Sequence, residues 1–244
     1  MKKEYKNLVI FLLIAFLLPF VSLVVQSMIS NDFTCFVLYG IQAATPTFSA
    51  ITVIYLFNKE KTFLVQMFRK EHLRKAIILP IIIVCTTMFL AKLIFCTLFG
   101  VDFALGSISA AQLVIILWAF FAEEIGWRGY LEPLLIQSGI HKRLVLCIVG
   151  IIWCLWHYHF FLRNGIQVPV PLFLISCIVE SYIYSFLMRA TSNNIISAMT
   201  YHFVWNLIIH IAAVNPVDNN GNIFPYVILV VLEALVLPVV MLLI

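Results

Sequence analysis

Eight long apolar runs divide the chain, and they restrict its possible folds more than any other feature. Each run is long enough to cross roughly 30 Å of hydrocarbon as a helix, where the segment must satisfy its own backbone hydrogen bonds. The runs are Leu8–Ile29, Phe33–Phe57, Ala76–Phe99, Ile108–Gln137, Leu144–Leu162, Pro171–Met188, Asn194–Val214 and Phe224–Ile244. We therefore predict an all-α, polytopic membrane bundle of about eight helices, with residues 1–244 forming one domain.

The composition supports a membrane protein and argues against several other classes. Hydrophobic residues make up 64% of the chain and charged residues 11%, whereas about a quarter of an ordinary soluble domain is charged. The start MKKEYK resembles a signal peptide, but the apolar run after it is too long, so we expect it to remain as the first span. The six cysteines form no C-x-x-C pair, so the sequence indicates neither a disulfide framework nor a thiolate zinc site. Basic and aromatic residues do not alternate, so we expect no nucleic-acid partner.

Basic residues gather at alternate ends of the predicted spans. One set of connections holds twelve of the fifteen Lys and Arg residues, and the loops around Asp32, Asp102, Arg163 and Asp218 hold one. The twelve are Lys2, Lys3, Lys6, Lys59, Lys61, Arg69, Lys70, Arg74, Lys75, Lys142, Arg143 and Arg189. Because Lys and Arg are retained on the cytoplasmic side, this bias predicts that both termini are cytoplasmic. We expect the protein to lie in the bacterial plasma membrane.

A few polar side chains interrupt the fourth and seventh runs. An ionisable group at membrane depth costs at least ~2.5 kcal/mol, so each one needs a partner or a function. Glu124 and Arg128 are four residues apart and share a helix face, which predicts an ion pair. Glu123 is turned about 100° away on an ideal helix and is left without a partner. His202 and Asn206 repeat the four-residue spacing, so two hydrogen-bonding groups point into one cavity.

The expected depth in the membrane places a residue of a third helix, His157, near Glu123, His202 and Asn206. At 1.5 Å per residue, Glu123, His157 and Asn206 lie roughly 18 to 21 Å above the cytoplasmic side, and His202 lies roughly 12 Å above it. In WHYHFF, His157 and His159 are two residues apart, so one faces the bundle and the other does not. Polar groups from three helices are thus expected at overlapping depths, although so few groups can also coincide by chance.

Each of these residues also has a purely structural interpretation. A single membrane histidine commonly makes an interhelical hydrogen bond, and Glu124 with Arg128 can simply stabilise a helix. Glu180 and Glu233 are interpreted as a packing pair or as a pair facing a lumen. The tryptophans of these spans are interpreted as packing aromatics, and they are Trp127, Trp153, Trp156 and Trp205.

Taken together, three motifs resemble a known family. EEIGWR, Glu123–Arg128, fits E-E-x-x-x-R, and HFVWN, His202–Asn206, fits H-x-x-x-N. Between them, WCLWH, Trp153–His157, is similar to F-x-x-x-H with Trp in place of Phe. In this order the motifs resemble the CAAX protease and bacteriocin-processing (CPBP, or Abi) family of intramembrane endopeptidases. The resemblance covers the catalytic core Ser107–Val214.

The resemblance implies a catalytic mechanism that uses activated water. By similarity, Glu123 and His157 position and deprotonate a water molecule, and His202 and Asn206 stabilise the developing oxyanion. The chain contains no G-x-S-x-G motif, so the sequence shows no serine elbow that would supply a covalent nucleophile, and activated water is the favoured interpretation.

Glu124 and Arg128 are assigned to organising this site. No cofactor is expected, because a glutamate-based mechanism needs no metal and the zinc motif H-E-x-x-H is absent. Zinc held by Glu123, His157 and His202 remains the alternative.

The expected partners are membrane lipid and a substrate that enters from the lipid or the cytoplasmic side. That substrate is a peptide or a membrane protein, and a prenylated C-terminus, a bacteriocin leader and a pheromone precursor all suit a site within the membrane. The competing class is a membrane immunity protein or peptide-binding scaffold of the same family that has no catalytic activity.

Overall fold

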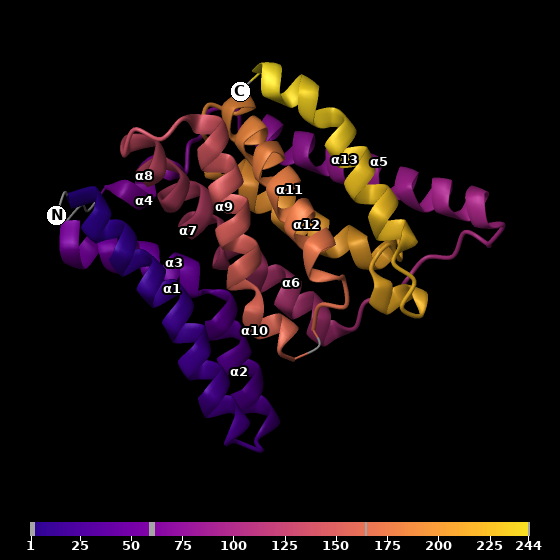
Figure 1. Ribbon diagram of the computed structural model, residues 1–244, viewed down its shortest axis with the longest axis horizontal. Coiled ribbons are helices and arrows are strands. Elements are labelled where there is room, and N and C mark those ends of the chain that lie inside the picture. The colour runs from indigo at the N-terminus through magenta and orange to yellow at the C-terminus, as the bar shows by residue number, and fades with distance from the viewer. Residues whose placement is uncertain (1–2, 59–61, 164, 244) are drawn as a thin grey trace.

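The protein is helical throughout the part described by a computed structural model, which covers residues 3–58, 62–163 and 165–243 (Figure 1). Side chains are described for residues 3–57, 62–163 and 165–237. The α-helices are α1 Lys3–Ser27, α2 Asp32–Ala43, α3 Thr45–Thr52, α4 Phe63–Met67, α5 Leu73–Phe99, α6 Ala110–Ala122, α7 Glu124–Gly126, α8 Glu132–Gln137, α9 Lys142–Trp156, α10 Tyr158–Phe161, α11 Val170–Ala190, α12 Ile195–Ile211 and α13 Phe224–Leu243. Two π-helices, Val53–Asn58 and Trp127–Leu131, and the 3-10 helix Pro216–Asn219 complete the order.

Six of these segments are long and apolar enough to cross a membrane, or seven if one bent pair counts as a span. The six are Lys3–Ser27, Leu73–Phe99, Ala110–Gln137, Lys142–Phe161, Val170–Ala190 and Ile195–Asn219. The described part of the last helix, Phe224–Leu237, is apolar but shorter. The prediction of an all-α membrane bundle is therefore confirmed, whereas the count of eight spans and the cytoplasmic termini stay predictions.

The second predicted span is bent instead of straight. Its two halves, α2 and the segment Thr45–Phe57, meet at an angle of 56°. Pro46 lies in the first turn of α3, where its missing N–H breaks no helical hydrogen bond but prevents a continuous helix. The bend brings α3 against α7, where a Cβ on Gly126 would lie 2.4 Å from the carbonyl carbon of Pro46. Only glycine permits this approach, so the bend supports the segment that carries Glu123.

The centre of the bundle is formed by α9, α11 and α12, with α6 and α7 against α12 (Figure 1). Helices α9 and α11 touch backbone to backbone, because a Cβ on Gly150 would lie 2.6 Å from Ile178 Cα. The hairpin of α1 and α2 covers one side of this centre, and α5 with α13 covers another. Trp127, Trp156 and Arg128 are among the largest fully buried side chains, so an aromatic core surrounds one buried charge.

Candidate active site

The segment predicted as one helix over Ile108–Gln137 is interrupted at Glu123. Helix α6 ends at Ala122, α7 begins at Glu124, and Glu123 between them has φ −120° and ψ −44°. The carbonyl of Glu123 accepts hydrogen bonds from the backbone N–H groups of Gly126 and Trp127, at 2.9 and 3.0 Å. A π-helix follows directly, and such irregular turns occur often at functional sites. Because the helix is interrupted here, the Glu123 side chain points in a different direction from the one that a continuous ideal helix would give it.

The Glu123 carboxylate is buried and held from two sides. Its Oε2 accepts hydrogen bonds from the indole nitrogens of Trp153 at 2.8 Å and Trp127 at 3.3 Å. Its Oε1 lies 3.8 Å from His202 Nε2. Both tryptophans pack against aromatic rings as predicted, Trp127 against Trp156 and Trp153 against Tyr184. They also bind Glu123, so the prediction that Glu123 has no partner is wrong. Trp127 lies four residues after Glu123, a spacing that could have shown this contact.

Behind Glu123, a second carboxylate holds His202 and a buried arginine. Glu124 Oε1 lies 2.7 Å from His202 Nδ1 and accepts a hydrogen bond from Arg128 Nη1 at 3.2 Å. The Arg128 guanidinium lies over the Tyr184 ring at 3.8 Å and over the Trp153 ring at 4.4 Å. The predicted ion pair between Glu124 and Arg128 is therefore confirmed. An ionised carboxylate only accepts, so His202 Nδ1 carries a proton and Nε2 faces Glu123.

His157 ends α9 and is held in one orientation. Its Nδ1 lies 2.7 Å from the carbonyl oxygen of Trp153. Because a carbonyl only accepts, Nδ1 donates, and Nε2 of the neutral ring keeps its lone pair. His159 is fully buried instead, with its Nδ1 2.8 Å from the carbonyl oxygen of Trp156. The prediction that the two histidines face different sides is confirmed, because only His157 lines the cavity described next.

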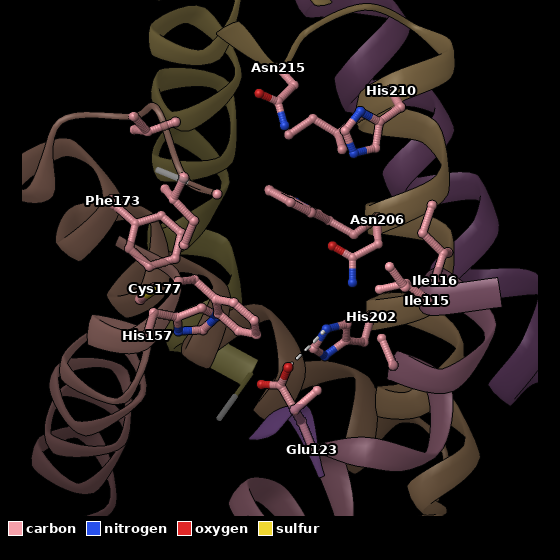
Figure 2. A pocket seen from close by; sticks show the side chains of 18 of the residues that line it. Ile115, Ile116, Glu123, His157, Phe173, Cys177, His202, Asn206, His210 and Asn215 are labelled. Atoms are coloured by element: carbon pink, nitrogen blue, oxygen red, sulfur yellow. Dashed lines mark ion pairs between the residues drawn. The ribbon is translucent and has the colours of Figure 1, made fainter. Parts of the chain in front are cut away.

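A cavity of about 350 Å³ joins the predicted residues of three helices. Glu123, His157, His202 and Asn206 all line it, and Figure 2 shows their side chains around one hollow, with Asn206 next to His202 along α12. The volume lies at the lower end of the range for small-ligand pockets, which suits a few residues of a peptide. Glu124 and Arg128 are not part of the lining, so they act on the cavity only through His202 and the aromatic rings.

Residues 105–208 match the sequence model of the family described as type II CAAX prenyl endopeptidase Rce1-like. Over this segment, the chain is similar to the Rce1-like family. The segment includes all the residues predicted for the site, which are Glu123, Glu124, Arg128, His157, His202 and Asn206. The family resemblance predicted from the three motifs is thus confirmed.

A curated relative of the Rce1-like segment is similar over the same limited length. The CAAX prenyl protease 2 of Methanococcus maripaludis is 30% identical over 105 residues, which are 39% of this chain and 38% of that protein. The chain therefore spans less than half the length of the relative it matches.

The cavity also contains polar residues to which the sequence assigned no catalytic role. Glu180 and Tyr226 line it, and both contact Ser176, whose hydroxyl donates to Glu180 Oε1 at 2.7 Å. Tyr226 in turn donates to Ser176 Oγ at 2.9 Å. Glu233 does not line the cavity and accepts a hydrogen bond from Tyr201 at 3.4 Å. Glu180 thus faces the cavity, whereas Glu233 is bound within the packing of α12 and α13.

The zinc alternative was tested against the donor geometry. Among the described residues, no group of three His, Cys, Asp or Glu side chains is gathered closely enough to hold a metal ion. Glu123, His157 and His202 share the cavity wall, but they do not form such a ligand set.

Proposed function

We propose that the chain is an intramembrane endopeptidase that hydrolyses a peptide bond with water activated by Glu123 and His157. The observation that carries this proposal is the Glu123 carboxylate, buried at a helix break and fixed by two indole donors beside a cavity. The similarity of residues 105–208 to the Rce1-like family supports the same reaction.

The base in this reaction is Glu123. A water molecule between Glu123 and His157 Nε2 loses a proton to the carboxylate while its oxygen attacks the carbonyl carbon of the substrate. The C–N bond of the tetrahedral intermediate then breaks, and Glu123 returns the proton to the leaving amine. The indole hydrogen bonds hold Oε2, so Oε1 remains free to exchange this proton.

The developing oxyanion needs donors, which α12 supplies. The Asn206 amide and the Nε2–H of a charged His202 supply them, and both lie on the same face of α12. Glu124 stabilises the charged ring through its 2.7 Å contact with Nδ1. Glu124 and Arg128 are therefore positioning residues, and neither contacts the substrate.

The proposal is tested with purified protein in lipid vesicles and a panel of labelled peptides, with and without a chelator. The panel contains a prenylated C-terminal peptide, an apolar leader peptide and a membrane-protein segment. Cleavage of at least one peptide, unchanged by the chelator, is the expected result. If peptides of the panel bind but none is cleaved, the result would instead support the alternative that the chain is a non-catalytic immunity or scaffold protein.

Replacing Asn206 by alanine is expected to lower the cleavage rate by about 10²- to 10³-fold, because one oxyanion donor is lost. Protein yield should change little, since Asn206 is only partly buried. The initial rate on the best peptide of the panel measures the effect. Asn31→Ala is the matched control, because Asn31 caps α2 and does not line the cavity. An Asn206→Ala rate equal to that of Asn31→Ala would contradict the oxyanion role.

A further inference from the structure

The cavity extends from Glu123 toward one end of the bundle. Above Asn206, its lining continues along α12 through Ile209 and His210 to Val217 in the following loop. Gln167, in the connection between α10 and α11, lines it at the same end. Val217 is 48% exposed and Gln167 is also exposed, so the cavity reaches the surface there.

The opposite end of the cavity is closed. Among the described residues, its lining includes none from 62–75, 127–150 or 185–200, which form the other end of the bundle. Trp127, which donates to Glu123, and Tyr201, which precedes His202 in the chain, are both fully buried. A substrate therefore has a path to Glu123 from the loop end that contains Val217.

Charge distinguishes these two ends. The described basic residues of the closed end are Lys3, Lys6, Arg69, Lys70, Arg74, Lys75, Lys142, Arg143 and Arg189. Lys2, Lys59 and Lys61, which contributed to the predicted orientation, lie outside the described residues. The loops of the open end contain Asp102, Arg163 and Asp218. Since Lys and Arg are retained in the cytoplasm, this bias predicts that the closed end is cytoplasmic and that the open end faces outward.

We propose that the cavity opens on the extracytoplasmic face and that its substrate is a peptide segment exposed there. This differs from the entry from the lipid or the cytoplasmic side that was expected from the sequence, and it excludes a chain end that stays in the cytoplasm. That a substrate enters this cavity rests on the proposed function. The direction in which the cavity opens does not depend on it.

The lining indicates which peptides fit. Uncharged amide side chains, Gln167, Asn206 and Asn215, alternate around it with apolar residues such as Ile116 and Phe173. Amides can pair with a peptide backbone, and the apolar wall suits uncharged side chains. The substrate is therefore an extended, mainly apolar and uncharged segment.

The rim of the opening is built from braced loops. The Gly106 N–H donates to the carbonyl of Ile211 at 2.9 Å, and a Cβ on Gly106 would lie 2.1 Å from the carbonyl oxygen of His210. Lys92 Nζ reaches the carbonyl of Ala213 at 3.4 Å. His210 Nδ1 lies 2.7 Å from Asp218 Oδ2, so these two ionisable groups of the rim bind each other.

Cysteine labelling of the full chain tests the direction of the opening. Ile209→Cys places a thiol deep in the cavity, Val217→Cys places one at its rim, and His141→Cys places one on the exposed connection at the closed end. A membrane-impermeant charged thiol reagent is added to intact cells and, separately, to inverted membrane vesicles. The parent chain already contains six cysteines, so its labelling is measured first and subtracted from that of each variant.

We expect Ile209→Cys and Val217→Cys to react in intact cells and His141→Cys to react only in inverted vesicles. Reaction of Ile209→Cys from the vesicle side only, or from neither side, would overturn the proposal. So would reaction of His141→Cys in intact cells. If Ile209→Cys does not accumulate, Ile116→Cys on α6 reports from the same cavity.

A peptide experiment separates this inference from the proposed function. An uncharged peptide that the protein cleaves in the panel is added to right-side-out vesicles and, separately, to inverted vesicles. Both kinds of vesicle contain the full chain. Cleavage only when the peptide contacts the outer face supports the inference, and cleavage only from the basic face overturns it while the enzyme proposal stands. If no peptide is cleaved but the labelling pattern holds, the cavity still opens outward and the proposed function fails.

Discussion

Glutamine in place of Glu123 is expected to lower the rate of peptide cleavage by about 10²- to 10⁴-fold while the protein stays folded. The amide keeps the shape of the side chain and can still accept the 2.8 Å hydrogen bond from Trp153. It cannot take a proton from water, so only the chemical step is lost. The initial rate under substrate saturation measures the change, with thermal unfolding as the check on folding.

Glu132→Gln is the matched control for this prediction. Glu132 is also a buried glutamate of the same span, 8% exposed, but it contacts Ser185 and does not line the cavity. We expect this variant to cleave near the parent rate. If Glu123→Gln cleaves as fast as Glu132→Gln, Glu123 is not the base.

The second large effect is expected on stability. Arg128→Ala removes a guanidinium that is 2% exposed and leaves the Glu124 carboxylate buried without its ion pair. Breaking a buried pair in this way costs about 3 to 5 kcal/mol. The variant also loses the ring contacts with Tyr184 and Trp153, so protein yield and unfolding temperature should both fall.

Activity should fall with stability, because Glu124 also positions His202. Arg163→Ala, which removes an exposed arginine at the open end, is the control and should behave as the parent. A fully stable and fully active Arg128→Ala protein would show that the pair has no structural role. The measurement is thermal unfolding in detergent together with the cleavage rate.

The membrane fold and much of the site follow from local sequence rules. Apolar length alone located the helices, because a membrane leaves the backbone few alternatives. The four-residue spacing of Glu124 and Arg128 gave their ion pair, which persists although the backbone there is partly a π-helix. The same spacing placed His202 and Asn206 on one wall of the cavity.

The surroundings of Glu123 could not be predicted in the same way. An ideal helix turns Glu123 away from any partner, but the chain breaks at this residue and directs the carboxylate toward two indoles. Trp153 lies on another helix, thirty positions away, so only the packing of α9 against this segment reveals the contact. The direction of the opening likewise depends on loops distant in sequence, such as those of Gln167 and Val217.

A double-mutant cycle tests most directly whether Glu123 and Asn206 act on one reacting water and carbonyl. The rates of the parent, Glu123→Gln, Asn206→Ala and the double variant are measured on the same peptide in the same vesicles. Groups that serve one transition state are not independent, so the double variant should lose less than the product of the two single losses. A double loss equal to that product, or a single variant at the parent rate, would contradict the account.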